Sequence, residues 1–204
     1  MKKKQFVTAL VFAAAAGLTM LLVVPLQNAT ANHLPADKIG VAGSAIQEVG
    51  PGEKVLLTST LRNSTPTDLM IQVTSECALW TNITSPSSEA VASVTVWVTL
   101  DGVPVPVTSD PAQGGPDDGK VVFCNRDFKI LALLSPQELI QLFLSSKSAN
   151  AFNWVAMNVG NGIHTIEVRA SLDQRVTGIG FAQAAVGKRT LIVEPAKLAN
   201  DASI

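Results

Sequence analysis

The stretch His164-Thr-Ile-Glu-Val-Arg-Ala-Ser-Leu172 alternates apolar with charged or hydroxylated side chains over its whole length. Successive residues of a β-strand point to opposite faces, so a period of two predicts a strand with one buried face. The same alternation recurs at Leu69–Thr74 and Val94–Leu100. Further β-rich runs are Val55–Leu61, Val121–Cys124, Phe152–Val159 and Arg189–Val193, with a weak first strand at Ile39–Val49. The 204-residue chain is therefore predicted to be all-β.

Turn residues separate these runs. Asp101-Gly102 stands between two valine-rich runs and predicts a two-residue hairpin. Asn63–Asp68 is rich in turn residues and predicts a second hairpin loop. Val103–Val107 carries prolines two residues apart, which predicts an edge strand because proline cannot donate to a neighbour. The number of runs predicts an antiparallel β-sandwich of seven to nine strands.

One segment departs from the β pattern. Ser135-Pro136-Gln137-Glu138 has a capping residue, a proline at the first helical position and a glutamate three residues after the cap. The apolar run Leu139–Leu144 follows. We expect one inserted α-helix near residues 136–148 that packs over the sandwich and shields Trp97.

The N-terminus has the parts of an export signal. Lys2–Lys4 are positive, Phe6–Leu26 is apolar and uncharged, and Ala29-x-Ala31 fits a cleavage site before Asn32. We expect residues 1–31 to be a signal peptide. The apolar stretch is also long enough to cross a bilayer, so an uncleaved membrane anchor stays open. Residues 32–50 are then an extension or first strand, 51–195 the sandwich, and 196–204 a C-terminal tail.

The charge and the cysteine content indicate which partners and which redox compartment to expect. The chain has 15 Lys+Arg and 16 Asp+Glu, a net charge of −1, and the leader holds three of the lysines. Nucleic-acid binding calls for a basic excess, so no nucleic-acid partner is expected. Cys77 and Cys124 are the two cysteines of an exported chain, which predicts a single disulfide between them.

Three segments resemble secreted prokaryotic immunoglobulin-like or fibronectin-III-like domains, namely Val94–Gly102, Gly162–Ala170 and Val186–Val193. The resemblance implies that the third segment is the last strand and that the second is entered through a corner. His164 then takes the place of a corner tyrosine whose polar tip bonds back to the backbone. The resemblance implies a fold and a cell-surface setting, but no activity.

Residues for chemistry are scarce. His33 and His164 are the only histidines, no Gly-x-Ser-x-Gly motif occurs, and the acidic residues are scattered, so neither an enzyme nor a cofactor is expected. Asp110, Asp117 and Asp118 are weak candidates for Ca²⁺ ligands, the alternative being a solvated acidic loop.

Two further features suit a binding surface. Trp97 points away from the valine face of its strand, so it is a candidate for stacking on a sugar unless the helix covers it. Asn63 and Asn82 begin Asn-x-Ser/Thr glycosylation sequons, which we expect in loops.

These features favour an exported, non-enzymatic structural or interaction domain, secreted or held at the cell surface or in the periplasm. Its partner is an unknown surface protein or glycan, and membrane contact is expected only if the leader is uncleaved. The alternative is a glycan- or calcium-binding module on the same fold.

Overall fold

The computed structural model describes residues 38–107, 117–131 and 141–196, which fold into antiparallel β-strands. The leader and the proposed cleavage site lie outside these ranges, as does the tail after Ala196. No helix in the described part of the chain is long and apolar enough to cross a membrane. The eight strands are β1 (Ile39–Gly43), β2 (Gln47–Val49), β3 (Lys54–Asn63), β4 (Thr67–Leu100), β5 (Val103–Pro104), β6 (Val121–Leu131), β7 (Gln141–Val159) and β8 (Gly162–Ala196).

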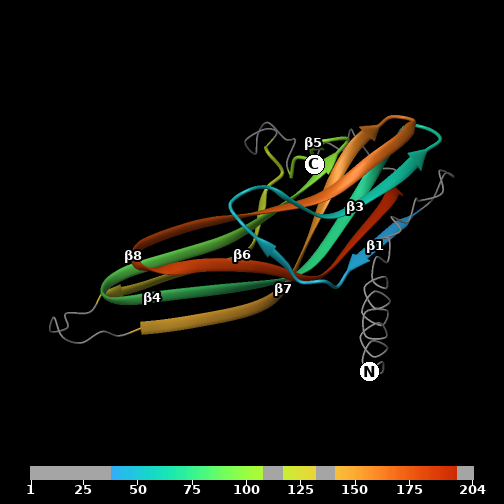
Figure 1. Cartoon of the computed structure of the whole chain (residues 1–204). Helices are drawn as coiled ribbons and strands as arrows, with labels where there is room; N and C mark the ends of the chain where they lie inside the picture. Colours follow the sequence, from blue (N-terminus) through green and yellow to red (C-terminus); the bar gives the residue numbers. More distant parts are fainter. Residues whose placement is uncertain (1–37, 108–116, 132–140, 197–204) are drawn as a thin grey trace, which may run out of the picture. The chain divides into compact units, whose positions relative to one another are not determined.

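Two very long strands, β4 and β8, form the centre of the fold. They pair antiparallel along almost their whole length, with a register shift between Thr84 and Glu89. At that point both strands bend and fold back (Figure 1). The first half of β4, residues 67–84, therefore pairs with the end of β8, and its second half, residues 89–100, pairs with the beginning of β8.

Local chemistry explains the bend. Gly178 has a φ of +81°, a conformation that residues with a side chain rarely adopt. A Cβ on Gly180 would lie 2.2 Å from the carbonyl oxygen of Asn82, so only glycine fits there. The hydroxyl of Ser88 donates to the carbonyl of Thr84 and accepts from the backbone N–H of Ile179. These contacts join the two strands where they turn.

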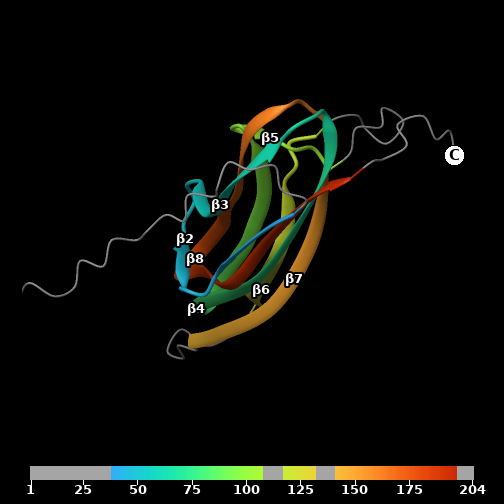
Figure 2. The ribbon, with the colours of Figure 1, turned by 90° about the vertical axis from the view of Figure 1, so that its right-hand side faces the viewer.

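The remaining strands widen the two halves. β7 pairs with the first half of β4, and β1 and β2 pair with the end of β8. β5 and β6 pair with the second half of β4, and β3 pairs with the beginning of β8. The result is one curled sheet whose halves contribute to a single apolar core, including Leu69, Ile71, Val94, Val96 and Ile166. Figure 2 shows β7 along the outer margin of this sheet.

The predicted all-β class is confirmed, but several predicted runs merge. The runs at Leu69–Thr74 and Val94–Leu100 are parts of β4, and those at His164–Leu172 and Arg189–Val193 are parts of β8. Period two marks the buried face in each half but does not show that the halves are continuous. Within residues 32–50, the described part supplies the short first strands β1 and β2.

The inserted helix is not seen. Residues 141–148 belong to β7, where they pair with β4 from Cys77 to Thr84, and residues 136–140 lie outside the described ranges. Leu142 and Leu144 alternate with Phe143, a strand pattern that the run of apolar residues concealed. Pairing along β4 outweighs the local capping signal, as tertiary context often does. Residues 141–148 form a strand and Phe143 is 58% exposed. The prediction that a helix including these residues packs over the sandwich and shields Trp97 was therefore wrong.

The two hairpin predictions had different outcomes. Asp101 and Gly102 have φ angles of 51° and 83°, and Leu100 pairs with Val103, so this hairpin is confirmed. Asn63–Asp68 connects β3 to β4, but both strands pair with β8 instead of with each other, so that hairpin was wrong. The proline-bearing segment does form an edge, because β5 ends the order β1-β8-β4-β5.

Candidate functional site

A hydrogen-bonded corner surrounds the Asp101-Gly102 turn. His164 Nδ1 lies 2.7 Å from Asp101 Oδ2, and His164 Nε2 lies 3.0 Å from the backbone oxygen of Gly160. The other oxygen of Asp101 accepts from the backbone N–H of Thr165 at 2.7 Å. The ring of His164 thus bonds back to the backbone, which is the contact that the family resemblance implies for a corner residue.

The same contacts set the protonation of this corner. The hydrogen bond to Asp101 raises the pKa of His164, against the opposing effect of burial, because both ring nitrogens face acceptors. For Asp101, burial alone would raise the pKa, but the hydrogen bonds from His164 and Thr165 outweigh it and lower the pKa. Each partner therefore favours the charged form of the other, and their hydrogen bonds hold the turn.

An open groove of about 590 Å³ runs beside this corner. One wall is the proline-bearing segment after the turn, and the other is the last part of β7. The exposed apolar side chains on its walls are Val103, Val107, Val155 and Met157. The groove lies between two strand edges that are not paired with each other in the described structure. Its shape and apolar character suit an extended, partly apolar segment of another molecule.

Trp97 is 2% exposed. The ammonium of Lys120 lies 5.5 Å from the centre of its ring, and Arg169 is its neighbour across the sheet on β8. The ring therefore offers no open face for a sugar. Parity placed Trp97 outside the main core, and the structure adds that this side of the strand is covered.

Trp80 has the partly open setting that was predicted for Trp97 as a sugar-stacking residue. This side chain is half-buried on β4 and lines a hollow of about 310 Å³. The polar side chains of Glu48, Gln174 and Gln183 line the same hollow. Extending the alternation of Leu69–Thr74 as far as Trp80 would have put this ring on the outer face, and that signal was missed.

The acidic residues of the predicted loop are engaged in turns. Asp117 Oδ1 accepts from the backbone N–H of Val107 and of Gly119, both at 2.8 Å. Asp118 bonds the backbone and the ammonium of Lys120. Asp110 lies outside the described residues. Within the described ranges, no group of three or more His, Cys, Asp or Glu side chains is placed to hold a metal ion.

Cys77 and Cys124 form the predicted disulfide, with Cα atoms 6.3 Å apart. Cys77 belongs to the first half of β4, whereas Cys124 lies on β6, which pairs with the second half. The bond therefore joins the two halves of the curled sheet across the core. Sequence alone predicted this pair because no other cysteine is present.

The two sequons differ in position: Asn63 is the last residue of β3 and the rest of its sequon lies in the connection to β4, whereas the Asn82 sequon lies inside β4 and not in the expected loop. Asn63 ends β3, is 6% exposed, and donates its side-chain N–H to the carbonyl of Gly160. Asn82 lies inside β4, where its cross-strand neighbours are Phe143 and Phe181. Strand pairing and buried contacts around both amides make them crowded acceptors for a glycan.

Comparison with known proteins adds little. No family model matches the chain, and no curated protein matches it. Among solved structures, the chain is similar to one titled as the structure of infectious bursal disease virus, Gx strain, at 12% identity and a TM-score of 0.25. It is also similar to a mutant VP2 protein of that virus in derived T=1 particles, at 13% identity and a TM-score of 0.23. The matches cover 80% and 78% of this chain but only 36% of each viral chain.

Proposed function

We propose that this protein is an exported, non-enzymatic β-sandwich domain of the cell surface or extracellular space that binds another protein. The two halves of the curled sheet are the proposed layers, in a plan similar to secreted immunoglobulin-like and fibronectin-III-like domains. The Cys77–Cys124 disulfide supports an oxidising compartment. The leader supplies the proposed route of export.

The groove beside the Asp101-Gly102 turn carries this proposal. The last part of β7 is a strand edge, and such an edge binds an extended peptide by adding backbone hydrogen bonds while side chains enter apolar pockets. The proline-bearing wall opposite contributes apolar surface. We therefore assign the groove to an extended segment of a surface partner protein. The Asp101–His164 pair fixes one end of the groove, because it ties the turn to the start of β8.

Photo-crosslinking on intact cells of the native host tests this assignment. A photoreactive amino acid at Met157, inside the groove, is expected to give one protein adduct. The matched control is Ile46, which is 77% exposed and lies outside the groove. The adduct should disappear in a Val155→Asp background and persist with Ile46→Asp. Equal adducts at both positions, or an adduct insensitive to Val155→Asp, would contradict the proposal.

The hollow at Trp80 favours glycan binding as a second candidate function. An indole face beside amide and carboxylate side chains matches the stacking and hydrogen bonding that sugars require. Binding to a glycan array is expected for the native protein and should be lost in Trp80→Ala. Trp97→Phe is the control, because that ring is covered and its replacement should leave binding intact. Equal binding by Trp80→Ala would remove this candidate.

A further inference from the structure

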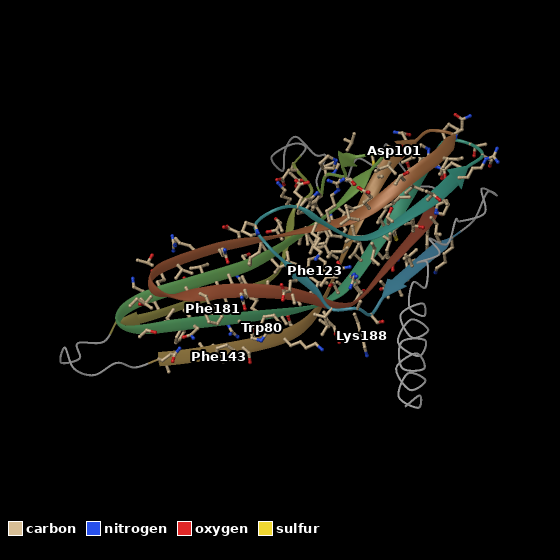
Figure 3. The ribbon with its side chains drawn as sticks, in the orientation of Figure 1. Trp80, Asp101, Phe123, Phe143, Phe181 and Lys188 are labelled. Carbon is tan, nitrogen blue, oxygen red and sulfur yellow. A yellow bond between two sulfur atoms is a disulfide. The ribbon has the colours of Figure 1, made fainter. Side chains whose placement is uncertain are left out.

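The first part of β7 is an exposed sheet edge. Within the described structure, β7 pairs with β4 alone, and every residue from Gln141 to Ala149 is exposed. Three consecutive apolar side chains stand there, with Leu142 39%, Phe143 58% and Leu144 36% exposed. Figure 3 places Phe143 in the same part of the fold as Trp80 and Phe181. Such an edge presents unpaired backbone groups beside uncovered apolar side chains.

The other described edges have features that discourage pairing. β1 and β2 are short, and β5 is followed by a second proline, Pro106. β3 and β6 each contain or adjoin a register irregularity and carry charged residues. The stretch of β8 near the bend, which pairs with β4 alone, contains Gly178 and Gly180 together with the charged residues Asp173 and Arg175. Short length, proline, bulges and charge are the means by which proteins keep sheet edges from associating.

Over its first part, β7 is neither short nor interrupted by proline or a bulge. From Gln141 to Ala156 its register with β4 is continuous, and the whole strand contains no proline and no glycine. Its one charged residue, Lys147, is paired with Glu76 on the adjacent strand at 3.1 Å. A long, regular, nearly uncharged edge with exposed apolar residues is expected to pair with another strand.

We propose that the occupant of this edge is the same segment of a second copy of the chain, so that two copies join their sheets through antiparallel β7 strands. A two-fold axis at Phe143 brings Phe143 opposite the partner's Phe143. It also brings Leu142 opposite the partner's Leu144, and Leu144 opposite the partner's Leu142. The Leu-Phe-Leu sequence is self-complementary in this register, as a two-fold interface requires.

The charge of the segment and the faces on which its side chains lie support a second copy as the occupant. Residues opposite each other in an antiparallel pair lie on the same face, so Phe143 meets an aromatic ring on the outer face and the leucines meet leucines on the inner face. Because Lys147 is neutralised by Glu76 within each copy, the two segments bring no unpaired like charges together. This edge is separate from the groove, whose β7 wall begins at Val155.

Sedimentation of the chain, expressed with its own leader and purified in its exported form, tests the association over about 1–100 µM. The native chain is expected to dimerise. Phe143→Lys places like charges opposite each other and should raise the dissociation constant at least about tenfold. The matched control is Ile179→Lys, on the stretch of β8 that pairs with β4 alone; Ile179 is 69% exposed. A native monomer throughout, or dissociation caused by Ile179→Lys and not by Phe143→Lys, would overturn the proposal.

Cross-linking tests the register and does not depend on the lysine variant folding. Opposite Cα atoms in an antiparallel pair lie about 4.5–5.5 Å apart, within the span of a disulfide. Phe143→Cys should therefore give a reducible covalent dimer under mild oxidation, whereas Ile179→Cys should not. A dimer formed equally by Ile179→Cys, or none with Phe143→Cys, would show that the axis does not lie at Phe143.

Discussion

Replacing Gly119 with alanine is expected to destabilise the protein strongly. The carbonyl oxygen of Gly119 accepts a hydrogen bond at 2.8 Å from Nε1 of Trp154, whose side chain is 1% exposed. Gly119 has a φ of +68°, and a Cβ there would lie 2.0 Å from the carbonyl oxygen of Val105. Alanine at this position therefore meets an unfavourable backbone conformation and a collision with another backbone segment.

The structure gives the size of the effect. A left-handed conformation costs a residue with a Cβ about 1–2 kcal/mol relative to glycine. The collision is with backbone, so the segment that carries Gly119 must move away from Val105 to relieve it. That movement disturbs the hydrogen bond between Gly119 and Trp154. Losing the bond to Trp154 leaves a buried indole N–H without a partner, which costs about 1–3 kcal/mol. Gly119→Ala should therefore lower the free energy of unfolding by about 2–5 kcal/mol.

Gly102→Ala is the matched control, because Gly102 has a φ of +83° and nothing lies within 4 Å of its added Cβ. It should show the backbone cost alone, about 1–2 kcal/mol. Urea unfolding followed by tryptophan fluorescence measures both variants, provided that the denaturant dependence stays unchanged. If Gly119→Ala loses no more stability than Gly102→Ala, the steric and hydrogen-bond parts of the reasoning are refuted. Trp154→Phe combined with Gly119→Ala should lose less than the sum of the single variants.

Three further outcomes are expected from urea unfolding. The raised pKa of His164 adds stability that is complete below the ordinary histidine pKa of 6.5 and is lost as pH rises through the pKa of the folded state. The lowered pKa of Asp101 adds stability that is lost at acid pH. His164→Gln should remove the first decline, and an unchanged pH profile would contradict this. Arg189 is 5% exposed and donates to three backbone carbonyls, so Arg189→Met should cost about 2–4 kcal/mol, and a change below about 0.5 kcal/mol would contradict it. Reducing the Cys77–Cys124 bond should cost about 4 kcal/mol by the loop-entropy model, and an unchanged urea midpoint would contradict that.

The sequence predicted the strands better than their pairing. Period two shows which face of a strand is buried, and that was enough for the class of the fold. It does not identify the partner strand, so the connection at Asn63–Asp68 looked like a hairpin although its strands separate to different halves of the sheet. Asp101-Gly102 was predictable because a two-residue turn with two positive φ angles allows little except direct pairing.

The bend of the long strands shows a second limit. Ser88 and Ile179 meet there only because β4 and β8 pair along both halves, which joins residues 91 positions apart in the chain. Local patterning carries no information about such a contact. The helix prediction failed for the same reason, since the capping signal at Ser135–Glu138 is local and the pairing of residues 141–148 with β4 is not.

The two tryptophans show how this limit affects the candidate sites. Parity correctly placed Trp97 on the side opposite the valine face. Whether its ring is accessible depends on what covers that side, which here is Lys120, just before β6, and Arg169 on β8. Trp80 follows the same parity rule and remains partly open, because β2 ends at Val49 and the adjoining edge of β8 is left uncovered beside the hollow. The candidate surfaces, namely the groove at the end of β7, the hollow at Trp80 and the β7 edge at Phe143, therefore all lie where a strand of the described structure has a neighbour on one side only. Their positions depend on strand pairing and register instead of on any local motif.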